Sequence, residues 1–155
     1  MTEIIDLDEL DKQILSILQD NAKASLRDIE KQIQLTPTSI RMRINRLKEK
    51  KVIKQYVTLI DCRYLGYREM VMASLRVNSS YPLDDLKRKI ELMDKIKYAY
   101  IITGEYPLFI MAKCLNHQDS MGLIENLRNL PGVEEVKTQI VLDKIKEDPS
   151  VIIPE

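Results

Sequence analysis

The sequence predicts an α+β protein in which a helix-turn-helix unit precedes a ferredoxin-like βαββαβ domain. In the first third of the 155 residues, apolar side chains recur at helical spacing in three short segments. The rest of the chain alternates strand-like runs with two amphipathic helices in the order βαββαβ. The hydrophobic content of 45% is sufficient for a core in each part. Wholesale disorder is therefore excluded.

Two amphipathic helices are expected at the start of the chain. Apolar residues at helical spacing predict a helix over residues 6–20. The stretch 21–25 interrupts this pattern, and its last residue, Ser25, can cap a short second helix. Asp28 follows Ser25 by three residues and could complete a reciprocal pairing of the capping-box kind.

A third helix is expected over residues 37–50 after the three-residue turn 34–36. Thr36 is a suitable N-cap, and Pro37 suits the first helical position because its missing N–H is not needed there. Two helices separated by a tight turn form a helix-turn-helix unit, whose second helix enters the major groove of DNA. The buried stripe of this helix is expected to be Ile40, Ile44 and Leu47.

The charge of the chain is unevenly distributed although its formal net charge is zero. Residues 1–22 carry six acids and one base, whereas residues 23–54 carry ten bases and three acids. A membrane-surface role is disfavoured because the apolar stripe of the third helix is narrow and is needed for the core. A merely solvated face would mix charge signs, yet only Glu49 interrupts the six bases between Arg41 and Lys51. This pattern favours a polyanion-binding surface.

The third helix therefore predicts contacts with double-stranded DNA. Residues on its outer face and flanks near the N-terminal end should reach base edges, where Arg suits guanine, Asn suits adenine and Met suits the thymine methyl group. These residues are Thr38, Ser39, Arg41, Met42 and Asn45. Contacts with phosphates are expected from Arg43, Arg46, Lys48, Lys50 and Lys51, and Thr36 at the helix start completes the expected DNA-binding set.

The second half of the chain predicts four strands and two helices. Strands 69–78 and 108–115 have apolar residues in both alternating phases, which is typical of strands buried on both faces. With both helices on one face of the sheet, the other face would be left bare, so it is expected to join copies of the chain through residues that include Met111. The remaining elements are helix 82–95, strand 98–104, helix 117–130 and strand 133–145.

The sequence gives little support for catalysis, metal binding or membrane insertion. His117 is the single histidine, and the four glycines form neither GxGxxG nor a P-loop. Cys62 and Cys114 lack metal-ligand spacing and are expected to be reduced thiols. No apolar run approaches the roughly 20 residues that span a bilayer, and the acidic N-terminus does not resemble a signal peptide. We expect a cytoplasmic protein that is not an enzyme and holds no metal or cofactor.

Four stretches resemble the leucine-responsive regulatory protein family, also called feast/famine or asparagine-operon-type regulators. They are LDELDKQILSILQDNAKAS, LTPTSIRMRINRLKEKKVIKQY, ITGEY and NLPGVEEVKTQIVLDKIK. The resemblance covers about residues 7–147. It implies a sequence-specific transcriptional regulator with a winged-type helix-turn-helix, a hinge strand and a domain that forms dimers, often further assembled into tetramers or octamers. The expected parts are helix-turn-helix 1–52, hinge strand and linker 53–66, dimerisation and effector domain 67–148, and tail 149–155.

The resemblance also implies an amino-acid effector site at the turn between the second and third strands of the regulatory domain. The family pattern there is approximately Gly-Asp-x-Asp-Tyr, whereas residues 104–108 read Gly-Glu-Tyr-Pro-Leu. Pro107 replaces the second acid and removes a backbone N–H donor, so a plain turn without a ligand stays an alternative. The expected effector residues are Gly104, Glu105, Tyr106, Thr138 and Gln139.

A second function also stays open from the sequence alone. The chain could be a small-molecule-binding regulatory module whose helical domain contacts a protein partner rather than DNA. The cationic third helix argues against this alternative, because protein interfaces favour aromatic and mixed surfaces.

Overall fold

The computed structural model describes residues 6–154, which form two compact units. The helical unit comprises the chain up to Leu59 together with the segment from Glu147 onward, and the sheet unit comprises Ile60–Lys146. The C-terminal segment therefore belongs with the N-terminal helices rather than with the strand that precedes it. Each unit has its own hydrophobic core, so each is described by itself.

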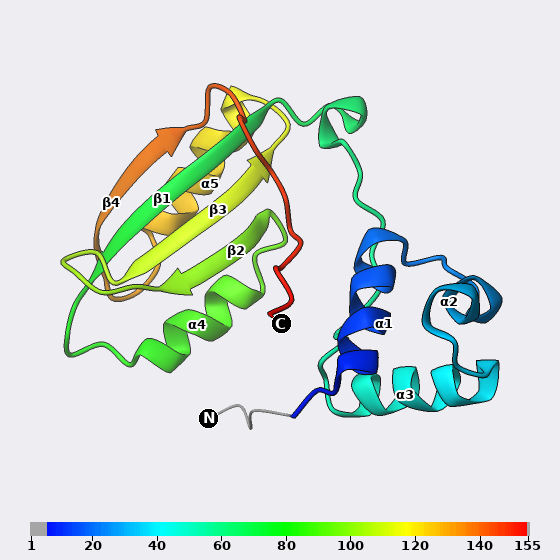
Figure 1. Cartoon of the computed structure of the whole chain (residues 1–155). Coiled ribbons are helices and arrows are strands. Elements are labelled where there is room, and N and C mark those ends of the chain that lie inside the picture. Colours follow the sequence, from blue (N-terminus) through cyan, green and yellow to red (C-terminus); the bar gives the residue numbers. More distant parts are fainter. Residues whose placement is uncertain (1–5, 155) are drawn as a thin grey trace. The chain divides into compact units, whose positions relative to one another are not determined.

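The helical unit contains the three predicted helices, α1 (Glu9–Asp20), α2 (Leu26–Ile33) and α3 (Pro37–Glu49) (Figure 1). The capping box of Ser25 and Asp28 is present, and Thr36 caps α3 with proline following at the first position, as predicted. The expected start of α1 at residue 6 is wrong. Asp8 is its N-cap and accepts a hydrogen bond from the backbone N–H of Asp11 at 2.8 Å, so the helix begins at Glu9.

The core of the helical unit is aliphatic and is formed by one stripe from each helix. Its most deeply buried members, Ile14, Ile29 and Ile40, are completely inaccessible to solvent. Because these residues recur at helical spacing, burying them fixes which face of α3 remains exposed. The other buried members are Leu18, Ile33, Ile44 and Leu47.

The segment that connects the two units, residues 54–68, contains no strand. Residues 54–61 are extended without a strand partner, where a hinge strand was expected, and a short 3-10 helix, η1, follows at Cys62–Leu65. Gly66 ends this helix with a φ of 84°, a left-handed conformation that suits glycine.

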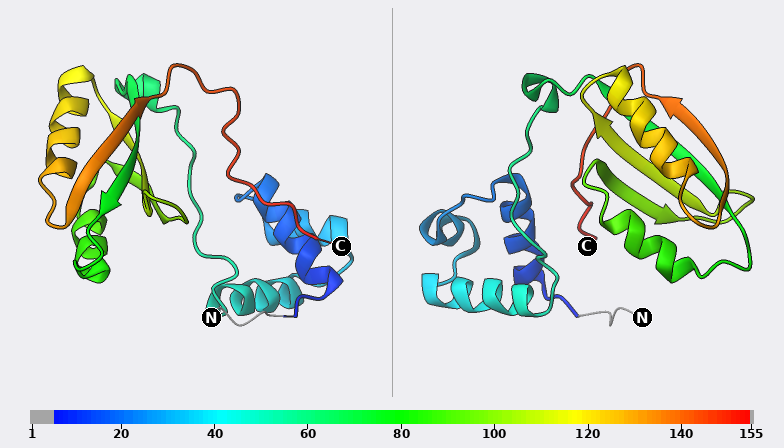
Figure 2. Two further views of the ribbon diagram at one scale, coloured as in Figure 1. Left: turned by 90° about the vertical axis from the view of Figure 1, so that its left-hand side faces the viewer. Right: turned by 180° about the vertical axis from the view of Figure 1, so that it is seen from behind.

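The sheet unit has the predicted βαββαβ order. It consists of β1 (Glu69–Val77), α4 (Leu83–Glu91), β2 (Ile96–Ile101), β3 (Leu108–Cys114), α5 (His117–Arg128) and β4 (Val133–Ile140). The four strands are antiparallel in the order β2-β3-β1-β4. Both helices lie on the same face of the sheet (Figure 2). This arrangement confirms the ferredoxin-like prediction.

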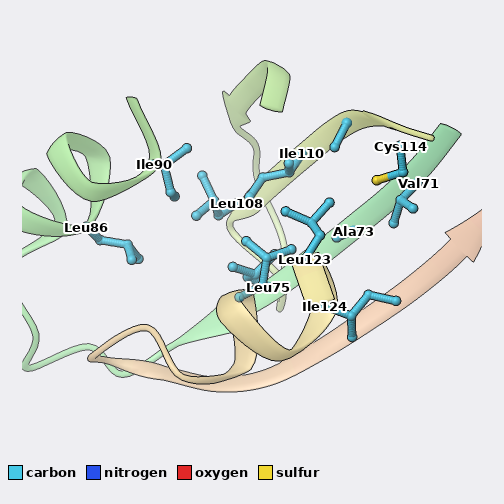
Figure 3. Close-up of a cluster of buried hydrophobic side chains, with 12 residues drawn as sticks. Val71, Ala73, Leu75, Leu86, Ile90, Leu108, Ile110, Cys114, Leu123 and Ile124 are labelled. Carbon is cyan, nitrogen blue, oxygen red and sulfur yellow. The ribbon is translucent and has the colours of Figure 1, made fainter. Parts of the chain in front are cut away.

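The core of the sheet unit lies between these helices and one phase of the central strands (Figure 3). Val71, Ala73 and Leu75 alternate along β1 with side chains that point to the opposite face. Leu86 of α4 and Leu123 of α5 pack against this phase and are almost fully buried. The burial of one phase leaves the other phase of β1 and β3 on the face without helices, which we call the open face.

Three element ends in the sheet unit differ from the predictions by three or more residues, and each difference follows from pairing or turn formation. Helix α4 ends at Glu91 rather than near residue 95, and two successive turns then lead into β2. Strand β2 ends at Ile101 because the hydrogen bond from the Ile102 N–H to the Pro107 carbonyl closes the turn. Strand β4 ends at residue 140 rather than 145, because β1 offers no partner beyond Met70.

None of the helices within residues 6–154 is both long and apolar enough to cross a membrane.

Candidate nucleic-acid interface and regulatory turn

The outer face of α3 carries the residues that were expected to read bases. Thr38, Arg41, Met42 and Asn45 are all exposed, opposite the buried stripe of the helix. Met42 is 68% exposed, which is a large apolar surface on an otherwise polar face. The sequence predicted this arrangement because the helical period alone separates the two faces.

The first turn of α3 holds its polar side chains through the cap. The Thr36 hydroxyl accepts a hydrogen bond from the Ser39 N–H at 3.3 Å and lies 3.0 Å from the Ser39 hydroxyl. Thr36 is exposed and Ser39 is half-buried. Both hydroxyls therefore lie at the start of α3, and each can form further hydrogen bonds with an incoming ligand.

The C-terminal end of α3 presents three exposed lysines. Lys48 places its ammonium 5.0 Å from the centre of the Tyr56 ring, a distance suited to a cation–π contact. Lys50 is the C-cap residue, and Lys51 follows it in a left-handed conformation with φ of 58°. Positive charge at a helix C-terminus is also favoured by the helix dipole.

Arg43 and Arg46 are turned toward α1 instead of projecting freely. The Arg43 guanidinium bonds Asp8 at 2.6 Å and Asp11 at 2.8 Å, and Arg46 bonds the second oxygen of Asp11. The Asp11 side chain is completely buried. The bonds from Arg43 and from the Asp11 N–H hold the pKa of Asp8 below its usual value, while the Asp8 and Asp11 carboxylates raise the pKa of Arg43. We call these four residues the Asp–Arg cluster.

The sequence does not predict the Asp–Arg cluster, although it shows an acidic segment before the basic third helix. The expectation placed Arg43 and Arg46 on phosphates, whereas the structure pairs both with carboxylates across 32 to 35 residues of chain. The available signal was that Asp8 and Asp11, three residues apart at a helix start, lie on one side of α1. Which basic side chains contact that side of α1 depends on how α1 and α3 cross.

The open face of the sheet unit carries an apolar patch at its centre. On β1 and β3, Met72 lies opposite Met111, and Tyr98 of β2 flanks Met111 on its other side. Tyr98 and Tyr100 stack with ring centres 6.2 Å apart, and each is about half exposed. No helix of the sheet unit covers this face (Figure 2). The apolar patch, as placed by strand register, consists of Met70, Met72, Tyr98, Tyr100, Phe109 and Met111.

Ion pairs and a hydrogen bond connect the turn after β2 to strands β1 and β4. Arg76 of β1 places its guanidinium 3.2 Å from Glu105 and 3.0 Å from Glu135 of β4. The Tyr106 hydroxyl donates a hydrogen bond to Glu135 at 2.9 Å, and the Lys137 ammonium lies 4.0 Å from the centre of the Tyr106 ring. Interaction with Glu105 raises the pKa of Arg76, and interaction with Tyr106 raises the pKa of Lys137. These five residues form the turn network.

The structure brings together only some of the expected effector residues. Gly104 has a φ of 117°, a conformation that would be strained for a residue with a side chain. The backbone of the turn therefore explains why glycine stands at the first position of the expected pattern. Gln139 pairs with Met72 on the open face, whereas Thr138 pairs with buried Ala73 and points to the helix-covered face. The two residues therefore lie on opposite faces of the sheet, and their contact with an effector stays a prediction. Sequence reasoning missed Arg76, because only the strand register places it beside the turn.

No group of three or more His, Cys, Asp or Glu side chains within the described part of the chain could hold a metal ion. His117 lies 3.7 Å from Glu69, and the buried Ser120 hydroxyl donates to the same carboxylate at 2.6 Å. Glu69 thus joins the start of β1 to α5.

Comparison with known proteins matches both units. Residues 7–48 match the AsnC-type helix-turn-helix domain, and residues 70–151 match the Lrp/AsnC ligand binding domain. The HTH-type transcriptional regulator FL11 of Pyrococcus horikoshii is 32% identical over 143 residues, which cover 92% of this chain and 94% of that protein. The leucine-responsive regulatory protein of Escherichia coli is 24% identical, with 96% of this chain and 92% of that protein covered.

Solved structures agree with these matches. Escherichia coli AsnC has a TM-score of 0.87 at 25% identity and covers 97% of this chain and 100% of its own. A Neisseria meningitidis transcriptional regulator, NMB0573, solved in complex with L-Met, has a TM-score of 0.87 at 19% identity and covers 95% and 97%. At 19% identity, the similarity to the Neisseria regulator shows a shared fold.

Proposed function

Because the chain belongs to the Lrp/AsnC family and is a DNA-binding transcriptional regulator rather than an enzyme, we propose that it reads its operator through the outer face of α3. The observation that supports this proposal is the division of α3 into a buried aliphatic stripe and an exposed polar face. A protein partner for the helical unit is not favoured, since that unit matches a DNA-binding domain. We also infer that the protein acts in the cytoplasm, where the operator DNA of such regulators lies.

The residues of α3 divide into base readers and phosphate contacts in this proposal. Arg41 and Asn45 are exposed and have the donor geometry for guanine and adenine, and Met42 offers an apolar surface to a thymine methyl. Their neighbours Thr38 and Ser39 complete the base-reading group. The phosphate contacts are Thr36, Lys48, Lys50 and Lys51 together with the exposed side of Arg46. Arg43 has its guanidinium committed to α1, so its role is to position the helix.

The experiment compares Arg41→Ala and Asn45→Ala with Lys50→Ala across a library of operator variants. Loss of a base contact should cost about 1–3 kcal/mol and relax the preference at one base position. Loss of a phosphate contact should weaken binding to every sequence alike and reduce the salt dependence. If the three variants lose affinity equally for all sequences, the proposed division is wrong.

We further propose that the chain acts as a dimer that is joined through the open face of the sheet unit. This face carries six large apolar or aromatic side chains and has no helix over it. A monomer rarely exposes such a patch, and a dimer presents two recognition helices to a two-fold symmetric operator. Met111→Glu should yield monomers in light scattering and lower operator affinity. An active monomer would contradict the proposed interface.

The effector is proposed to be a small amino acid that binds beside Gly104, Glu105 and Tyr106, with Gln139 on the same sheet face. The matching of residues 70–151 to a ligand binding domain supports this class. Glu105 is paired with Arg76 at 3.2 Å, so an incoming ammonium group has to compete with a guanidinium already present. Arg76 in turn could receive the carboxylate, replacing the N–H that Pro107 lacks.

Calorimetry of the chain against all twenty amino acids tests the effector proposal, with L-Met first because the Neisseria regulator was solved with it. We expect weak binding that Glu105→Ala abolishes. Tight binding that survives Glu105→Ala would place the site elsewhere. No heat from any amino acid would mean that the turn is a structural element without a ligand.

A further inference from the structure

The segment after β4 returns to the helical unit and is held there by one side chain. Gln19 of α1 donates from its Nε2 to the Val151 carbonyl at 2.8 Å and accepts from the Val151 N–H at 3.0 Å. A single amide side chain thus pairs both backbone groups of one residue, as a neighbouring strand would. Among side chains, only Asn and Gln carry a donor and an acceptor in this arrangement.

An apolar groove lies beside this pair of hydrogen bonds. Its volume is about 500 Å³, and all of the residues that line it belong to the helical unit. The C-terminal segment borders the groove through Pro149, Val151 and Ile153, of which Ile153 is half-buried whereas the intervening Ile152 is 96% exposed. The other aliphatic lining residues are Leu15, Leu18, Ala22, Val52, Ile53, Val57 and Leu59.

Local contacts restrict the conformation of the segment where it first lines the groove. The Asp148 carboxylate accepts the Ser150 N–H at 2.9 Å, and hydrogen bonding to Ser150 holds the pKa of Asp148 below its usual value. Pro149, which lies between them, fixes its own backbone φ. A segment with fewer free conformations loses less entropy when it binds.

We propose that the chain's own C-terminal segment, residues 148–153, docks reversibly on the helical unit as one wall of this groove, and that docking makes a second connection between the two units. The covalent chain leaves the helical unit at Leu59 and returns at Glu147, so docking closes the intervening sheet unit into a loop. The connection is reversible because Val151 is held by two hydrogen bonds while its side chain remains 67% exposed. The segment follows β4, which carries the Glu135 and Lys137 side chains of the turn network. Movement of β4 therefore has a physical route to the helical unit.

Hydrogen exchange of the Val151 amide in the full-length chain, followed by NMR, tests the docking. Gln19→Leu removes both hydrogen bonds and should accelerate exchange of this amide about tenfold, the factor that corresponds to about 1.4 kcal/mol. Gln13→Leu is the matched control, since Gln13 is exposed on the same helix, and should leave the rate unchanged. Equal rates in the wild-type chain and both variants would overturn the docking.

Crosslinking identifies which chain supplies this wall of the groove. In a Cys62→Ser background, Ala22→Cys and Ser150→Cys, which both line the groove and leave Gln19 in place, are joined by a short bismaleimide, and we expect a product of monomer mass. A covalent dimer would show that the segment of a second copy supplies this wall and would overturn the proposal as stated. Neither exchange nor crosslinking depends on the proposed DNA binding, so failure of that function is recognised separately.

Operator affinity then tests whether the connection matters for regulation, and this arm rests on the proposed function. Gln19→Leu should change the affinity several-fold, while Gln13→Leu should not. Equal affinities of the two variants would show that the docked segment has no part in regulation.

Discussion

Removing the Asp11 carboxylate should destabilise the helical unit more than any surface change on α1. Asp11 is completely buried and accepts hydrogen bonds from Arg43 and Arg46, whose side chains are 25% and 50% exposed. In Asp11→Ala, both guanidiniums keep their charge but lose this partner. Arg43 retains Asp8 at 2.6 Å, which limits the loss.

The magnitude follows from these contacts. A hydrogen bond to a charged group contributes about 1.5–3 kcal/mol, and breaking a fully buried ion pair costs about 3–5 kcal/mol. Because both arginines reach solvent and one keeps a second carboxylate, the lower part of that range applies. We expect Asp11→Ala to reduce the free energy of unfolding of the helical unit by about 2–3 kcal/mol, and Asp11→Asn, which keeps one acceptor, to reduce it by about half as much.

Native-state hydrogen exchange by mass spectrometry is the suitable assay, because two compact units need not unfold in one transition. Peptides from α1 and α3 report on the helical unit, and peptides from β1 and β3 serve as an internal reference. Asp20→Asn, an exposed acid on the same helix, is the control and should stay within about 0.5 kcal/mol of the wild-type chain. If Asp11→Ala behaves like Asp20→Asn, the Asp–Arg cluster does not hold α3 on α1.

Three further predictions concern acid sensitivity, the turn network and the thiols. Arg43 lowers the pKa of Asp8 in the folded chain, so its stabilising contribution is present above the usual Asp pKa of about 4 and is lost as pH falls through the lower folded value; Asp8→Asn should flatten the acid limb of a pH–stability curve. Arg76→Met should speed amide exchange at the turn after β2 because it removes the ion pairs to Glu105 and Glu135. Arg88→Met, at an exposed residue of α4, should have no effect, and equal effects of the two changes would contradict the turn network. Burial raises the pKa of the Cys114 thiol, so a maleimide should modify Cys62 alone in the folded chain and both thiols in urea.

The sequence by itself determined what local rules control. The caps of α2 and α3, Ser25 with Asp28 and Thr36 with Pro37, depend on residues within three positions of each other. The helical period then assigned the buried stripe and the exposed face of α3, and the alternation of β1 and β3 indicated a sheet with one face covered and the other available to a second chain. Family motifs added the turn after β2 as the expected position of an effector site.

The tertiary structure decided the contacts between residues that are distant in the chain. Arg43 and Arg46 were read as phosphate ligands because their charge is local information, whereas their partner Asp11 lies 32 and 35 residues away on another helix. Thr138 and Gln139 fell on opposite sheet faces once the β1–β4 register was known. The pairing of Gln19 with Val151, separated by 132 residues, leaves no periodic or compositional signal, because one exposed amide and one backbone suffice to form it. Such contacts depend on how the elements pack, and packing is determined by the whole chain rather than by the residues adjacent to each contact in the sequence.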